Sequence, residues 1–134
     1  MIDIERIAIG DGLSPLICPP ITREQLRAYA AASGDHNPLH TDSATAQAAG
    51  QADVIAHGML VMGLVGRMLR NYLGDATLRR FGVRFRTPTR LGDTLSCGGK
   101  ITAVDRAASL IHGEVWAADA SGEIKLAGSF EASV

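Results

Sequence analysis

The sequence has few aromatic residues, few cysteines and almost no net charge. Its 13 basic residues are balanced by 14 acidic ones, which leaves a net charge of −1. A nucleic-acid partner would call for a basic surface, so we expect none. The longest apolar run, residues 59–65, is too short to span a bilayer, and no basic region followed by an apolar stretch opens the chain. We therefore expect a cytoplasmic protein with no signal peptide and no membrane partner.

The cysteines and histidines show no pattern of a disulfide framework or a metal site. Cys18 and Cys97 lie far apart in the sequence, which is typical of reduced thiols in a cytosolic protein. No pair of the four histidines has the close helical or loop spacing with a cysteine that zinc sites show. The sequence therefore predicts no metal and no cofactor.

Apolar residues are plentiful. They make up 46% of the 134 residues, against 20% charged, so the chain can bury a core and residues 1–134 are expected to form one compact domain. Helical patterns cover residues 22–33, 43–49 and 58–73. A short strand is expected at residues 13–18, and period-two patterns follow from residue 78, from residue 95 to 104, at 110–118 and at 124–134. This order predicts an α+β fold with an antiparallel sheet.

The segment from Tyr29 to His40 is the most informative stretch. An alanine-rich helix is expected to end at Gly34, and Pro38 prevents a helix from continuing through the next turn. Asp35 and His40 then lie at the two ends of a short rigid loop, where a carboxylate and an imidazole can hold one water for acid–base chemistry. Taken alone, the same residues are also typical of a plain turn and a solvated histidine.

Two motifs in order favour the catalytic interpretation. Ser-Gly-Asp-His-Asn-Pro-Leu-His at residues 33–40 and Ile-Ala-His-Gly-Met-Leu at residues 55–60 resemble the signatures of the MaoC-like, R-specific enoyl-CoA hydratases. The resemblance extends from about Thr22 to the C-terminus. It implies a hotdog fold, in which an antiparallel sheet wraps around a central buried helix, and it implies that Asp35 and His40 are the catalytic residues.

The His57-Gly58 pair precedes the predicted central helix. Free backbone N–H groups at a helix N-terminus can stabilise negative charge on a thioester carbonyl oxygen. The resemblance implies this role for Gly58, with His57 as a supporting residue. The alternative is a simple helix cap. Asn37 either supports the loop and the Asp35 carboxylate or is only a turn residue.

Two features of the sequence leave alternatives open. Arg80, Arg84 and Arg86 share one strand face, which is either solvated or a contact for the phosphates of coenzyme A or of a carrier protein. Gly63 and Gly66 lie inside the central helix, which is apolar nearly all round and is expected to be buried. We expect close packing against Gly63 and an acyl channel beside Gly66.

Gly66 also stands where many R-specific hydratases have a serine. In this respect the chain resembles mycobacterial-type 3-hydroxyacyl dehydratase subunits, whose helix likewise begins His-Gly-Met-Leu. That resemblance leaves dehydration open as the physiological direction, and it also leaves open a heteromeric assembly.

These residues predict a hydratase or dehydratase that interconverts trans-2-enoyl and (R)-3-hydroxyacyl thioesters of coenzyme A or acyl carrier protein. One of Asp35 and His40 takes a proton from water and the other handles the proton at the α-carbon. The alternatives are a non-catalytic hotdog subunit and a hotdog thioesterase. The absence of Asp or Glu in residues 58–73 counts against the thioesterase. The family resemblance further implies a homodimer, or a heterodimer with a related subunit.

Overall fold

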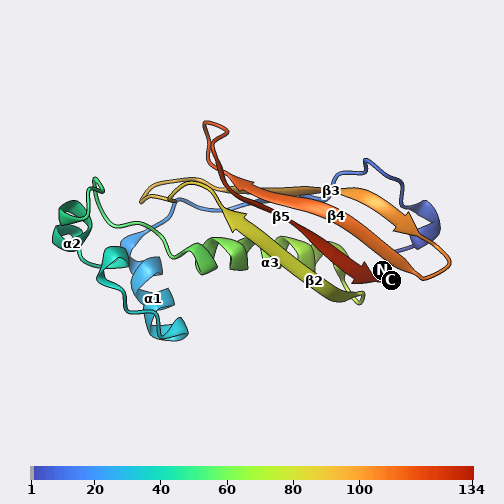
Figure 1. Cartoon of the computed structure of the whole chain (residues 1–134), viewed down its shortest axis with the longest axis horizontal. Coiled ribbons are helices and arrows are strands. Elements are labelled where there is room, and N and C mark those ends of the chain that lie inside the picture. The colour runs from blue at the N-terminus through green and yellow to red at the C-terminus, as the bar shows by residue number, and fades with distance from the viewer. Residues whose placement is uncertain (1) are drawn as a thin grey trace.

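The computed structural model describes residues 2–134 (Figure 1), so Met1 of the expected domain lies outside the described residues. The elements in chain order are η1 (Ile4–Arg6), β1 (Leu16–Ile17), α1 (Arg23–Ser33), η2 (Pro38–His40), α2 (Ser43–Ala48), α3 (Gly58–Leu73), β2 (Thr77–Phe85), β3 (Ser96–Asp105), β4 (Leu110–Ala118) and β5 (Ile124–Ser133). Within the described chain, no helix is long and apolar enough to cross a membrane.

The strands form one antiparallel sheet in the order β1-β3-β4-β5-β2. The sheet curls over α3, and α1 and α2 lie together beyond the first turn of α3 (Figure 1). The predicted hotdog fold, with an antiparallel sheet curved around a central helix, is confirmed. The N-terminal strand is shorter than expected, because only Leu16 and Ile17 pair with β3, and a single bridge joins Gly12 to Lys100.

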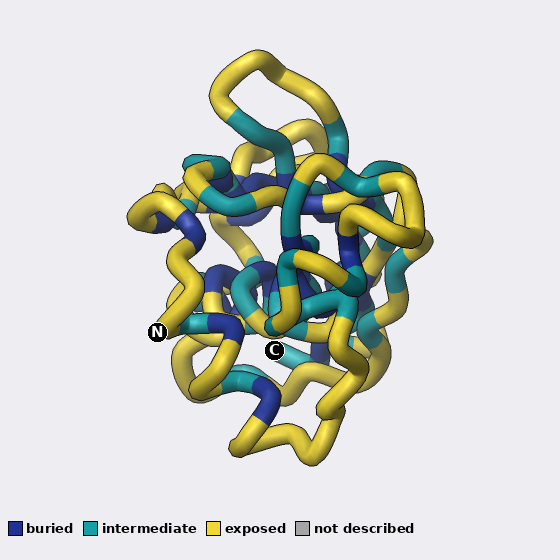
Figure 2. The backbone as a smooth tube through the Cα atoms, turned by 90° about the vertical axis from the view of Figure 1, so that its left-hand side faces the viewer, coloured by how far each residue is buried: buried dark blue, intermediate teal, exposed yellow. Residues whose placement is uncertain are grey.

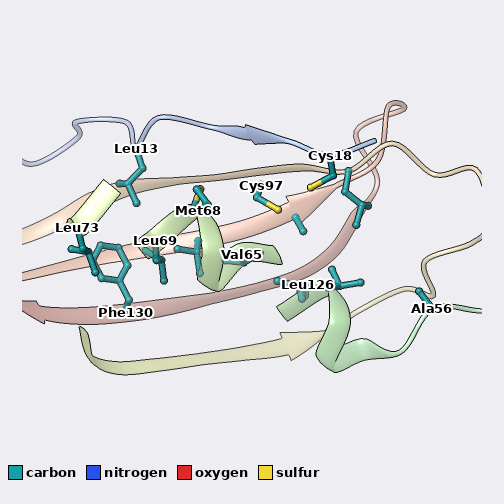
Figure 3. Packing of buried hydrophobic residues seen from close by; sticks show 14 of the residues in the cluster. Leu13, Cys18, Ala56, Val65, Met68, Leu69, Leu73, Cys97, Leu126 and Phe130 are labelled. Atoms are coloured by element: carbon teal, nitrogen blue, oxygen red, sulfur yellow. The ribbon is translucent and has the colours of Figure 1, made fainter. Parts of the chain in front are cut away.

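The core lies between the sheet and α3. Along β4 buried and half-buried positions alternate, as expected for a strand with one face against a core. Gly113 on this strand leaves room for the ring of Phe130 on β5, since a Cβ there would lie 2.3 Å from the ring. Figure 3 shows side chains of α3 and of the sheet meeting in this layer, and Figure 2 shows the buried stretches gathered in the middle of the molecule.

Only one face of α3 is buried. Val61, Val65, Met68, Leu69 and Leu73 point into the core, whereas Met59 is 57% exposed and Gly63 is exposed. The expectation that the helix is buried all round is therefore wrong for this chain. A five-stranded sheet covers one side of a helix, and no other described element covers the opposite side along its length.

The two helix glycines differ in how they compare with the expectation. A Cβ at Gly63 would meet nothing within 4 Å, so no strand of this chain packs against that position and the predicted packing is wrong within this chain. At Gly66 the nearest atom would be Cε2 of Phe81, at 3.4 Å, which is an ordinary contact with a side chain of β2. The acyl channel beside Gly66 stays a prediction.

Cys18 and Cys97, although distant in sequence, are neighbours in the core (Figure 3), and both are free thiols. Cys18 follows β1 and Cys97 lies in β3, which pairs with β1. Burial, together with the nearby Cys18 sulfur, raises the pKa of the Cys97 thiol to about 12. The prediction that both are reduced thiols agrees with this arrangement, because a thiol with so high a pKa is seldom ionised and reacts slowly.

Candidate active site

The loop after α1 is built from local side-chain hydrogen bonds. Gly34 ends the helix in the left-handed conformation (φ 77°), where a residue without Cβ is favoured. Asp35 Oδ1 then accepts from Asn37 N (3.2 Å), and Asn37 Oδ1 accepts from Leu39 N (3.1 Å). Pro38 opens the 3₁₀ turn η2, which ends at His40. Asn37 is thus a turn residue whose backbone also holds the Asp35 carboxylate, so the two interpretations of Asn37 describe one arrangement.

Asp35 and His40 face each other across this loop. Oδ2 of Asp35 lies 3.9 Å from Nε2 of His40. This separation is too long for a direct hydrogen bond, but one water at ~2.8 Å from each atom can bridge it. The Asp35 side chain is 52% exposed and that of His40 is 12% exposed, so the pair lies at a boundary between solvent and protein.

The hydrogen bond of His40 to the backbone determines its tautomer. Nδ1 lies 2.7 Å from the carbonyl oxygen of Ile55, which can only accept, so Nδ1 carries the proton. The neutral ring therefore presents an unprotonated Nε2 toward Asp35. Ile55 is itself held by a hydrogen bond from its N–H to Leu39 O (3.1 Å), so the carbonyl that orients His40 is fixed to the same loop.

His57 contacts both Asp35 and His40. Its ring stacks on that of His40 with centroids 3.9 Å apart, and Tyr29 meets its edge at 4.8 Å. Nε2 of His57 lies 3.1 Å from the backbone oxygen of Asp35 and donates to it. His57 is 1% exposed, and this burial is the main cause that lowers its pKa. The ring is therefore neutral at pH 7.

Gly58 begins α3. His57 stands at the N-cap position but makes no side-chain cap hydrogen bond, so the simple capping interpretation of His57 does not hold. The first N–H groups of a helix have no partner within it, and Gly58 carries the first of them. Negative charge placed at this end is also favoured by the helix dipole.

A cavity of about 310 Å³ contains both His40 and Gly58 in its wall. The remaining wall comes from the segment before α3, from Val61 of α3, from the end of β2 with the loop that follows it, and from Lys125 of β5. The residues of the first and third of these parts are Ile55, Ala56, Phe85, Arg86, Thr87, Pro88 and Thr89. Asp35, Asn37 and His57 lie outside this lining. The structure therefore brings Asp35, His40 and His57 into one cluster and places only His40 and Gly58 on the cavity.

Lys125 lines this cavity, which sequence reasoning missed. Its side chain is 3% exposed, and Nζ donates to Pro88 O (3.0 Å) and to Glu123 (2.9 Å), with Asp119 at 3.3 Å and Asp93 at 3.4 Å. Burial lowers the pKa of Lys125, but the three carboxylates outweigh it and raise the pKa above its usual value. By the period of two, Lys125 shares a strand face with Ser129 and Glu131, opposite the core residues Leu126 and Phe130, so no signal for its burial was available in the sequence.

The loop held by Lys125 contacts the segment that precedes α3. Thr89 O accepts from Ala56 N at 2.8 Å, next to the Ile55 carbonyl that orients His40. Among the three arginines considered from the sequence, all are exposed and only Arg86 lines the cavity.

Asp35, His40 and His57 can also be tested as a metal site, because one ligand atom from each lies within 4.8 Å of the others. The rings of His40 and His57 are stacked at an interplanar angle of 25°. An imidazole binds a metal in its own ring plane, and two nearly parallel planes do not meet at one ion. The residues present do not suit a shared metal ion.

Comparison with known proteins agrees with this fold. The family model of the MaoC like domain matches residues 8–119. The chain is 40% identical over 85 residues to 3-hydroxyacyl-thioester dehydratase X of Mycobacterium tuberculosis (60% of this chain, 30% of the relative). It is also 30% identical over 98 residues to the (R)-specific enoyl-CoA hydratase of Rhodospirillum rubrum (72% of this chain, 68% of the relative).

Among solved structures, the ChsH1-ChsH2 complex of M. tuberculosis contains a chain similar to this one at a TM-score of 0.84 and 26% identity, with 95% of this chain and 98% of that chain covered. The match to dehydratase X spans less than a third of that relative's length, so the resemblance concerns one part of it. The matched family model covers most of the sequence, and the chain belongs to the MaoC-like dehydratase family.

Proposed function

We propose that this protein is a hydro-lyase that interconverts trans-2-enoyl and (R)-3-hydroxyacyl thioesters. The observation that carries the proposal is the pairing of Asp35 Oδ2 with Nε2 of His40, 3.9 Å apart, beside a cavity that also exposes the start of α3. The dehydratase and hydratase relatives support the same chemistry. The substrate is an acyl thioester of coenzyme A or of an acyl carrier protein.

In the hydration direction, one water is held between Asp35 and His40. Its two hydrogens point to Oδ2 and Nε2, so the oxygen lone pair is free to attack the β-carbon. Nε2 of His40 takes a proton from the water as the C–O bond forms, and Asp35 stabilises the resulting imidazolium. The double-bond electrons move to the α-carbon and carbonyl, and the imidazolium returns a proton to the α-carbon on the same face. One water is thus added in the syn sense.

The carbonyl oxygen gains negative charge during this step. The N–H of Gly58 at the start of α3 is the donor that we assign to it, and such donors are among the largest contributions to catalysis of acyl chemistry. His57 is assigned a positioning role, because one ring contacts His40 and holds the backbone of Asp35 at the same time.

The test is hydration of crotonyl-CoA, followed by loss of the conjugated thioester absorbance. Asp35→Asn and His40→Gln should each lower kcat by about 10²–10⁴-fold without loss of fold. His40 is the positioned acid–base group, and Asp35 holds the water and stabilises the imidazolium, so loss of either interrupts a contribution of that scale. His36→Gln is the matched control, because His36 is an exposed histidine of the same loop that does not line the cavity. Near-full activity in both Asp35→Asn and His40→Gln would refute the assignment.

We also propose that the protein works as a dimer, either of two copies or with a related hotdog subunit. The uncovered face of α3, with Met59 57% exposed, and the unpaired edge of β2 in the described sheet support a second chain on this side. The similar chain in the ChsH1-ChsH2 structure belongs to a complex of two different proteins. Light scattering should show a dimer, and full activity of a monomer at high dilution would contradict this.

The second candidate function is a non-catalytic subunit, which would be favoured if replacing Asp35 and His40 changed no activity. A chain without chemistry has no need of Asp35 and His40 together, so their arrangement favours the enzyme.

A further inference from the structure

The ring of Phe85 lies against the residue assigned to the thioester oxygen. A Cβ built on Gly58 would lie 3.0 Å from Cε1 of Phe85 and 3.2 Å from both Cδ1 and Cζ. One edge of the ring is therefore in contact with Gly58, and glycine is the residue that permits this approach. Phe85 also belongs to the wall of the cavity that contains His40.

Phe85 is not needed to fill the core. It is 53% exposed, although it follows the same strand face as Phe81, which is half-buried and packed on the core. Phe85 is the last residue of β2, and the strand continues into the cavity wall of Arg86, Thr87, Pro88 and Thr89. Within this chain, Phe85 thus lines the cavity and lies outside the core cluster.

We propose that Phe85 determines which acyl groups the enzyme accepts, by limiting substituents on the α-carbon of the thioester. This inference rests on the proposed function. A carbonyl oxygen bound by the N–H of Gly58 lies ~2.9 Å from that nitrogen. The atoms bonded to the carbonyl carbon, which are the sulfur and the α-carbon, then fall beside the ring that contacts Gly58.

The ring leaves room for a planar, unbranched enoyl group and meets a methyl group on the α-carbon. The wild-type protein should therefore prefer crotonyl-CoA to trans-2-methylbut-2-enoyl-CoA, which has the same chain with one methyl group added at the α-carbon. One methyl group in an apolar pocket changes kcat/KM by about 10–200-fold, which sets the expected size of the preference.

The experiment measures kcat/KM for both thioesters with the wild type, Phe85→Ala and Phe85→Leu. The ratio of branched to unbranched kcat/KM should rise by at least ~10-fold in Phe85→Ala and by a smaller factor in Phe85→Leu. Phe81→Leu is the matched control, since Phe81 lies on the same face of β2, contacts Gly66 instead of Gly58 and is absent from the cavity wall. Its ratio should stay at the wild-type value.

The outcomes separate this inference from the proposed function. A wild-type protein without activity on either thioester overturns both. An active wild type that turns over the branched substrate as well as crotonyl-CoA overturns the role of Phe85 alone. An unchanged ratio in Phe85→Ala with crotonyl-CoA still hydrated, or an equal change in Phe81→Leu, has the same consequence.

Discussion

Replacing Lys125 with methionine removes a buried ammonium while keeping most of its apolar volume. The change leaves Asp93 and Asp119, 22% and 16% exposed, facing each other without their cation. It also removes the hydrogen bond to Pro88 O, which holds the cavity loop at 3.0 Å. The variant should lose much more stability than a variant with an exposed lysine replaced.

The size of the loss follows from the burial of the partners. Breaking a fully buried ion pair by removing one partner costs about 3–5 kcal/mol. Glu123 is 53% exposed, so its share is near the ~0–1 kcal/mol of a surface pair. With the other two carboxylates partly exposed, we expect a fall of about 3 kcal/mol in the free energy of unfolding. For a chain of this length that corresponds to a Tm lower by about 10 °C.

Urea unfolding followed by the fluorescence of Trp116, the one tryptophan of the sequence, measures this loss. Lys100→Met is the matched control. Lys100 pairs with Glu114 at 3.1 Å, but the two side chains are 52% and 45% exposed, so the change should be below ~1 kcal/mol. If Lys125→Met lost no more stability than Lys100→Met, the ion cluster would not be what holds the loop.

Three further predictions concern α3, His57 and the buried thiols. Gly63→Ala and Gly66→Ala should each keep or raise the free energy of unfolding by up to ~1 kcal/mol in thermal melts, because neither Cβ meets an obstacle within this chain; a large loss would mean that another chain occupies that face. The pKa of His57 is lowered in the folded state, so the contribution of His57 to the free energy of unfolding should be fully present above pH 6.5. It should be lost as the pH falls below 6.5, because the unfolded chain then binds a proton that the folded chain binds less readily. In urea unfolding at a series of pH values, His57→Gln should show a smaller loss of stability over this range. Cys97, with its pKa raised to about 12, should not react with a thiol reagent at about pH 8 until the protein is unfolded, and rapid native labelling of Cys97 would contradict its burial.

Local chemistry made the first half of the site predictable. Thr22 caps α1 by accepting from Gln25 N, and Gly34 ends it, as the sequence indicates. The turn residues between Gly34 and His40 then bond to one another, which is why the amino-acid order indicates that Asp35 and His40 lie close together. The contacts that orient them come from Ile55 and His57, which are distant in sequence.

Contacts across the sheet were beyond such reasoning. The position of Phe85 over Gly58 and of Lys125 under Pro88 depends on the register of β2 against β5, where Phe85 pairs with Leu126. A shift of one residue would exchange the two faces of the strand, and short apolar patterns do not specify that register. The prediction that α3 is buried all round was wrong for another reason. An apolar helix face indicates that something covers it, but the sequence does not show whether the cover comes from the same chain or from another one.

The acid–base loop also has a consequence for how this fold can change over time. From Ala31 to Thr45 no residue is buried, so the segment that carries Asp35 and His40 contributes nothing to the core. Substitution of Asp35, whose side chain is 52% exposed, can remove the proposed acid–base pair at little cost in folding free energy, since exposed positions usually change stability by less than ~0.5 kcal/mol. After gene duplication, one copy can therefore lose its activity and still fold. A complex of one active and one inactive chain can arise in this way.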